Sequence, residues 1–140
     1  MSRVKNRNTQ QELLIRSLLH RLGFRFRLHC QEYPGTPDII LPKYRTAIFV
    51  NGCFWHGHSC KRGKLPKTHH AFWKSKIEKN MMRDRENVLK LIELGWKPII
   101  IWTCETTSIQ KLSVLGNRLV DEIQYGHSMC DGVHSDTLKD

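Results

Sequence analysis

Apolar positions recur at helical spacing in three stretches of the chain, residues 9–22, 71–94 and 108–123. The first begins with Thr9-Gln10-Gln11-Glu12, which has the spacing of a capping box, and ends at Gly23. The second is the longest, and Gly95 provides its end. The side chains expected on the buried stripe of the first helix are Leu14, Leu18, Leu19 and Leu22. Those expected on the second are Ile77, Met81, Val88, Leu91 and Ile92.

Shorter segments have the patterns of strands. Apolar residues alternate with arginines over residues 24–28, and a hairpin is predicted from residues 38–41 and 46–50. Residues 97–102 are rich in β-branched side chains and follow a helix, so this strand is expected to join the sheet parallel to residues 46–50. The pattern predicts one α/β domain over residues 1–125. The polar, aperiodic residues 126–140 are predicted to be a disordered tail.

The charge of the chain indicates a polyanionic partner. Its 140 residues include 23 basic and 13 acidic side chains, which gives a formal net charge of +10. Such a surplus is typical of proteins that bind nucleic acid. No apolar run reaches the roughly 20 residues of a membrane span, and the N-terminus lacks the apolar segment of a secretion signal. We therefore expect a cytoplasmic, nucleoid-associated protein in which clustered cysteines bind metal, rather than one whose five cysteines form a disulfide framework.

Two cysteines and two histidines crowd the segment from Cys53 to Cys60. Zinc takes four thiolate or imidazole ligands, so Cys53 and Cys60 are candidates, with either His56 or His58 as the third. The fourth is expected to be Cys104, just beyond the last predicted strand. The alternative is an ordinary loop with a buried Cys104.

Three carboxylates are candidates for catalysis. Asp38 lies where a turn leads into a strand, a position at which a carboxylate can bind Mg²⁺, although Pro-Asp is also a common turn. Glu12 lies upstream and has the alternative role of a capping residue. Asp84 falls on the interior face of the longest predicted helix and requires a partner there. One candidate partner is the zinc-loop histidine that does not bind metal, which would act as a general acid or base while the carboxylate holds it. The alternative partner is an arginine, which would make the contact a structural ion pair.

Aromatic and basic residues are interleaved around the same loop. Planar side chains can wedge between base pairs while cations hold phosphates. Large aromatic residues also fill cores, and at least one of Phe54, Trp55 and Trp73 is expected to do so. The candidates for DNA binding are Phe54 and Trp55 in the loop and Trp73, Lys76 and Asn80 on one helical face.

Several motifs follow one another between Met1 and Thr106. They are Ile48-Phe49-Val50-Asn51-Gly52-Cys53-Phe54-Trp55-His56-Gly57-His58-Ser59-Cys60, Pro34-Gly35-Thr36-Pro37-Asp38, Phe72-Trp73, Lys79-Asn80, Arg83-Asp84 and Leu94-Gly95-Trp96. In this combination the chain resembles the very-short-patch repair endonucleases. The resemblance implies a restriction-endonuclease-like fold of the PD-(D/E)xK type, with a mixed central sheet flanked by helices and a structural zinc site. It also implies Mg²⁺-dependent nicking of duplex DNA beside a T:G mismatch left by deamination of 5-methylcytosine.

The resemblance also implies a role for each motif residue. Asp38 and the main-chain carbonyl of Val50 would bind Mg²⁺, with Glu12 as an accessory acid. His56 would be the catalytic histidine and Asp84 its partner. The implied zinc ligands are Cys53, His58, Cys60 and Cys104, and the implied intercalating residues are Phe54, Trp55 and Trp73. Asn51 departs from the family pattern, because some members have a second active-site histidine at this position.

The expected partner is double-stranded DNA containing a T:G mismatch, bound by a monomer that acts with mismatch-repair proteins and has no contact with a membrane. Two alternatives stay open. One is a restriction-type nuclease that cuts both strands of matched DNA, and the other is a zinc-stabilised DNA-binding module without catalysis.

Overall fold

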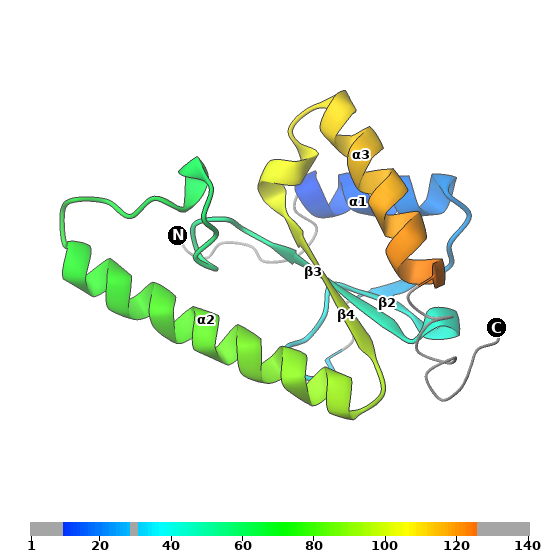
Figure 1. The fold of residues 1–140 in the computed structure, drawn as a ribbon, viewed down its shortest axis with the longest axis horizontal. Coiled ribbons are helices and arrows are strands. Elements are labelled where there is room, and N and C mark those ends of the chain that lie inside the picture. Colours follow the sequence, from blue (N-terminus) through cyan, green and yellow to red (C-terminus); the bar gives the residue numbers. More distant parts are fainter. Residues whose placement is uncertain (1–9, 29–30, 126–140) are drawn as a thin grey trace.

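The computed structural model describes residues 10–28 and 31–125 and has a mixed α/β architecture (Figure 1). Its helices are α1 (Gln10–Arg21), α2 (His70–Glu93) and α3 (Ile109–Val120), the last continuing into a π-helical turn over Asp121–Tyr125. Its strands are β1 (Arg27–Leu28), β2 (Ile39–Leu41), β3 (Thr46–Asn51) and β4 (Lys97–Trp102). Short 3-10 turns occupy Pro42–Tyr44 (η1), Lys61–Gly63 (η2) and Thr103–Thr106 (η3).

Within the described residues the strands form one mixed sheet in the order β1-β2-β3-β4. The predicted hairpin is confirmed, since β2 and β3 pair antiparallel with Ile39 opposite Ile48. The predicted parallel pairing is also confirmed, and its register places Asn51 opposite Trp102. Parallel strands need a long crossover, and α2 provides it. The register consequently brings the segments that follow Asn51 and Trp102 to the same end of the sheet.

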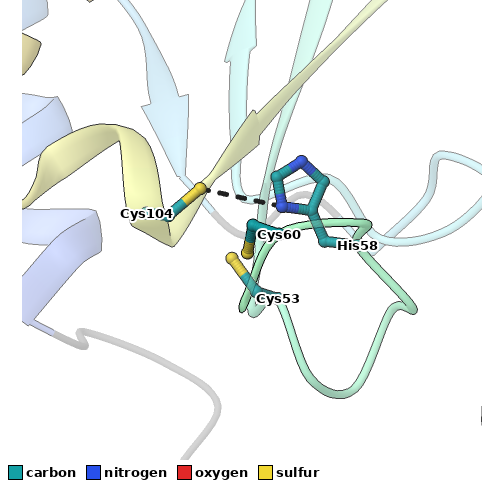
Figure 2. Close-up of side chains that lie close together, drawn as sticks. All are labelled: Cys53, His58, Cys60 and Cys104. Carbon is teal, nitrogen blue, oxygen red and sulfur yellow. Dashed lines mark hydrogen bonds between the residues drawn. The ribbon is translucent and has the colours of Figure 1, made fainter. Parts of the chain in front are cut away.

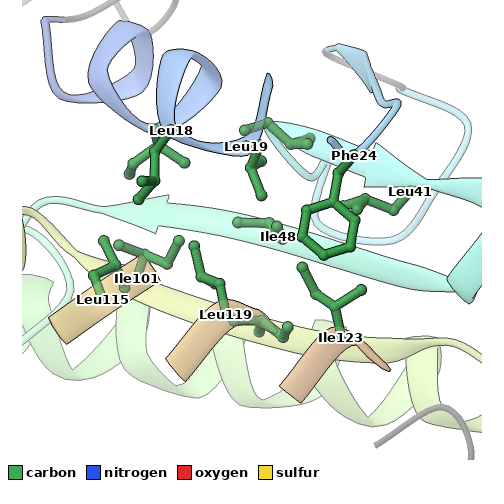
Figure 3. Packing of buried hydrophobic residues seen from close by; sticks show 12 residues of the cluster. Leu18, Leu19, Phe24, Leu41, Ile48, Ile101, Leu115, Leu119 and Ile123 are labelled. Atoms are coloured by element: carbon green, nitrogen blue, oxygen red, sulfur yellow. The ribbon is translucent and has the colours of Figure 1, made fainter. Parts of the chain in front are cut away.

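The helices cover both faces of the sheet. Helices α1 and α3 lie together on one face, whereas α2 runs along the other (Figure 1). The larger core cluster lies between the sheet and the first pair, and Figure 3 shows its leucine, isoleucine and phenylalanine side chains interlocked. A smaller cluster beneath α2 contains Ile40, Ala47 and Leu91. Because α2 buries only Ile77 and Leu91 fully, most of this helix faces solvent.

Several predicted boundaries and faces are wrong. In α1 the buried apolar residues are Ile15, Leu18 and Leu19, while Leu22 lies beyond the helix end and is 38% exposed. The strand predicted over residues 24–28 begins only at Arg27, because the Phe24 N–H still donates to the Leu19 carbonyl and the Phe24 ring packs into the core.

The apolar face predicted for α2 is also too wide. Met81 is 37% exposed and Ile92 is 53% exposed, because the sheet beneath the helix contacts a narrower stripe that includes Leu91.

Two further expectations concern parts outside the described residues. Thr9 of the predicted capping box lies there, as does the predicted tail over residues 126–140. Within the described part, no helix combines the length and the apolar character needed to cross a bilayer.

Candidate functional site

Four metal-binding side chains converge where β3 and β4 end. Cys53, His58 and Cys60 come from the loop after β3, and Cys104 comes from η3 directly after β4 (Figure 2). One donor atom from each lies within 4.8 Å of the others. The ligand atoms of tetrahedral zinc bound by thiolates are about 3.8 Å apart, as follows from Zn–S distances near 2.3 Å. The four donors therefore fit a zinc ion with only small side-chain adjustments.

The electrostatics of this cluster favour a bound cation. Burial raises the pKa of the Cys104 thiol to about 11, and the neighbouring thiols of Cys53 and Cys60 act in the same direction. Ionised thiols at this spacing repel one another, and a divalent cation among them removes that repulsion. The structure also separates the two histidines, since His58 belongs to the cluster and His56 does not.

His56 instead contacts α2. Its Nδ1 atom lies 2.5 Å from Oδ2 of Asp84, and both side chains are about one-third exposed, 29% and 32% respectively. Gly57, at φ +69°, packs directly against Met81 and Ile77 of α2, so the loop backbone approaches the helix closely. An imidazole held by a carboxylate, with one nitrogen left for substrate, is an arrangement suited to general acid-base chemistry. The partner that Asp84 contacts here is this histidine rather than an arginine.

A buried acidic pair forms at the junction of α1 with the sheet. Asp38 accepts a hydrogen bond of 2.7 Å from the Val50 N–H. Burial, with a smaller contribution from the Glu12 carboxylate, raises the pKa of Asp38 to about 7, although the Val50 hydrogen bond and Arg16 act in the opposite direction. Glu12 is 3% exposed and lies 3.4 Å from the Arg16 guanidinium. Two carboxylates forced together in a buried place form a donor set suited to a hard divalent cation.

Aromatic rings gather beside the metal cluster. The rings of Phe54, Trp55 and Trp73 contact one another edge to face, with centroids 5.1 to 5.7 Å apart. None of the three is fully buried, and Trp55 is 49% exposed. The expectation that at least one would fill the core is therefore wrong, because the rings pack on each other at the surface. Such a platform can present aromatic faces and edges to a ligand.

The polar candidates on α2 have different surroundings. Asn80 donates a 2.9 Å hydrogen bond to the Trp55 carbonyl and accepts one from Arg83. It therefore fixes the loop that carries Trp55. Lys76 is exposed.

Four residues around the site were missed by sequence reasoning. Phe72 is 60% exposed and extends the aromatic group through Trp73. Arg16 was detectable from its i+4 spacing to Glu12. Trp102 and Thr103 touch the metal cluster, and their position directly before Cys104 was the available signal.

Asn51, the departure from the family pattern, is 8% exposed at the end of β3.

Comparison with known proteins gives concordant matches. The family model "DNA mismatch endonuclease Vsr" matches residues 1–62. The type II nicking enzyme V.XorIIP of Xanthomonas oryzae is 44% identical over 121 residues, which cover 86% of this chain and 89% of that protein. V.NmeAIP of Neisseria meningitidis, also a type II nicking enzyme, is 43% identical over 89% of both chains. The DNA mismatch endonuclease Vsr of Escherichia coli is 42% identical over 81% of this chain and 72% of its own length.

Proposed function

The chain belongs to the very-short-patch repair endonuclease family, and from this premise we propose that it nicks one strand of duplex DNA beside a T:G mismatch in very-short-patch repair. The observation that carries the proposal is the Cys53–Cys60 loop. It brings together the His56–Asp84 pair, the aromatic platform and the metal cluster. The further proposals are a restriction-endonuclease-like domain over residues 1–125 and a cytoplasmic monomer that works with mismatch-repair proteins.

We assign hydrolysis to the end of the sheet where β3 leads into the loop. Asp38 and the Val50 carbonyl would hold Mg²⁺, with Glu12 as an accessory acid, and the hydrogen bond from the Val50 N–H already holds Val50 against Asp38. A divalent cation supplies charge neutralisation at the scissile phosphate and lowers the pKa of an attacking water. His56 would move a proton to or from the reacting oxygens through its Nε2, since Asp84 occupies Nδ1 and fixes the ring.

Recognition is assigned to the aromatic platform. Phe54, Trp55 and Trp73 would enter the base stack, with Lys76 and Asn80 near the bases and phosphates. A mismatched step costs less to unstack than a paired one, so a wedge converts weak pairing into selectivity. The zinc held by Cys53, His58, Cys60 and Cys104 would be structural, because four protein ligands leave no open position for substrate.

The test uses end-labelled duplexes with and without a single T:G pair, incubated with and without Mg²⁺. We expect a nick in one strand beside the mismatch, and only with the metal. Denaturing and native gels distinguish a nick from a double-strand break. Breaks in the matched duplex would instead identify a restriction-type nuclease, and retention without cleavage would identify a DNA-binding module.

The Asp38→Asn variant completes the experiment. It removes an anionic ligand at nearly constant shape, so nicking should fall more than tenfold while DNA binding stays near the wild-type level. Asp121→Asn changes an exposed carboxylate in the final helical turn and is the matched control. Retained activity in Asp38→Asn would place the metal elsewhere.

A further inference from the structure

Three consecutive residues, the last of β4 and the first two of η3, take part in the metal cluster. Trp102 contacts His58, Thr103 contacts Cys53, and Cys104 is itself a member. We propose that Trp102 and Thr103 are positioning residues that hold the cluster in its metal-binding geometry and slow the release of zinc. This inference rests on the proposed zinc site, but it concerns two side chains that are not ligands.

Thr103 makes a hydrogen bond to sulfur. Its Oγ1 atom lies 3.5 Å from Sγ of Cys53. A cysteine bound to zinc is a thiolate and has no proton, so in the metal-bound protein the hydroxyl must be the donor. The bond withdraws charge from the sulfur and fixes its position. The Thr103 carbonyl accepts a 2.8 Å bond from the Thr106 hydroxyl, which closes the η3 turn and holds Thr103 in place.

Trp102 orients the imidazole ligand. Its ring stacks on His58 with centroids 4.1 Å apart and an interplanar angle of 17°. In this orientation Nδ1 of His58 lies 3.7 Å from Sγ of Cys104 and faces the cluster (Figure 2). The indole thus restricts ring rotation before any metal binds. Partners of this kind around ligands commonly alter metal affinity by about 10- to 100-fold.

The support for this pair extends to α3. The backbone N–H of Trp102 donates a 2.8 Å hydrogen bond to Glu105, whose other carboxylate oxygen is paired with Arg118 of α3. Arg118 also donates to the Ile100 carbonyl and to Glu122. The end of β4 is therefore anchored to α3, and the loop after β3 docks onto it.

The consequence extends to the proposed active loop. Cys53 and His58, the two ligands that Thr103 and Trp102 contact, lie on either side of Phe54, Trp55 and His56. Holding both ends of this six-residue segment restricts the positions of the proposed intercalating rings and of the proposed catalytic histidine, His56. Loss of either contact should loosen the segment even while the four ligands are all present.

The test compares zinc release from purified full-length protein to a colorimetric chelator. Thr103→Val removes the hydroxyl at constant shape, and we expect zinc release to accelerate about tenfold. Thr103→Ser, which keeps the hydroxyl, should restore the slow rate. Thr107→Val is the matched control, since that hydroxyl bonds the Cys104 carbonyl and not a sulfur. Trp102→Leu should accelerate release, whereas Trp102→Phe, which can still stack, should do so less.

Cobalt-substituted protein gives a readout that a general loss of stability would not move. A hydrogen bond stabilises the sulfur lone pair, so its loss in Thr103→Val should shift the thiolate-to-cobalt charge-transfer band to longer wavelength. A band and a release rate equal to those of wild type would overturn the proposal while leaving the zinc site and nicking intact. Wild-type protein purified without zinc would overturn the site together with the proposal, and the nicking assay reports separately on the proposed function.

Discussion

His56 Nδ1 and Asp84 Oδ2 lie 2.5 Å apart across 28 positions of sequence, which joins the Cys53–Cys60 loop to the middle of α2. When the imidazole is neutral, this contact determines its tautomer. A carboxylate at Nδ1 requires a proton on that nitrogen, so the lone pair is on Nε2. Only the second nitrogen then remains for chemistry.

Replacing Asp84 with Asn tests this relationship. The amide can still accept the bond but has no charge, so we expect nicking to fall at least about tenfold, a part of the 10²- to 10⁴-fold that a general acid or base contributes. The single-turnover nicking rate is the measurement. Glu78→Gln, an exposed acid on the same helix, is the control. A rate equal to that of wild type would make the contact purely structural.

The pKa of Asp38 predicts a dependence of stability on pH. Burial raises this pKa from 3.8 to about 7, with Glu12 adding to the effect. Between these values the folded protein keeps a proton that the unfolded chain has lost, so this group lowers the free energy of unfolding as pH rises from about 4 to about 7. Asp38→Asn removes the contribution and should flatten the curve.

Urea denaturation of wild type and Asp38→Asn from pH 5 to 7.5, in zinc-replete buffer without magnesium, measures the difference. Taking the difference between the two proteins cancels the contributions of other groups. A second series with magnesium added tests the metal site. Magnesium binds the ionised carboxylate, so it should stabilise wild type at the upper end of the pH range but not the variant. Parallel curves for the two proteins would contradict a raised pKa at Asp38.

The two loop histidines should respond differently to removal. His56→Ala should abolish nicking with zinc content unchanged, because its contact is with Asp84 and not with the thiols. His58→Ala should lose zinc and thermal stability together, since the binding energy of structural zinc contributes to folding. Metal analysis and thermal melts check both. Zinc loss in the first variant and retention in the second would mean that the assignments are reversed.

Gly57 is expected to be intolerant of a side chain. A Cβ there would collide with Sδ of Met81 and lie 3.0 Å from Ile77 Cγ2, at a φ of +69° that favours glycine. Gly57→Ala should therefore push the loop away from α2 and separate His56 from Asp84. We expect a loss of nicking of about tenfold or more, since displacements near 1 Å can cost about 100-fold. Adding Met81→Ala to Gly57→Ala should restore part of the nicking rate. An unchanged rate in Gly57→Ala alone would show that nicking does not need the close approach of the loop to α2.

The sequence pattern predicted which cysteine and histidine side chains come together better than it predicted the buried faces of the helices. Cys104 could be assigned to the cluster because a parallel strand ending at Trp102 must end beside the strand ending at Asn51. The contact of Thr103 with the Cys53 sulfur depends on side-chain geometry that spacing does not specify. Leu22 was placed on the buried stripe because it is apolar and has the helical spacing of the other leucines. The helix ends before it and the chain turns at Gly23, so Leu22 stays at the surface. Periodicity identifies a helix, whereas the neighbouring elements decide which of its side chains are buried.

The last prediction concerns selectivity for the mismatch. Trp55 is 49% exposed and leans on Phe54 and Trp73, and Asn80 fixes its carbonyl, so the indole is held at the surface rather than in the core. If it enters the base stack, Trp55→Ala should reduce cleavage of T:G duplex more than cleavage of matched duplex, because the wedge exploits the lower cost of unstacking a mismatched step. The ratio of the two single-turnover rates is the measurement, with Met82→Ala as an exposed apolar control on α2. A parallel fall in both rates at constant ratio would make Trp55 a packing residue of the loop, and selectivity would then depend on polar contacts such as those available to Lys76.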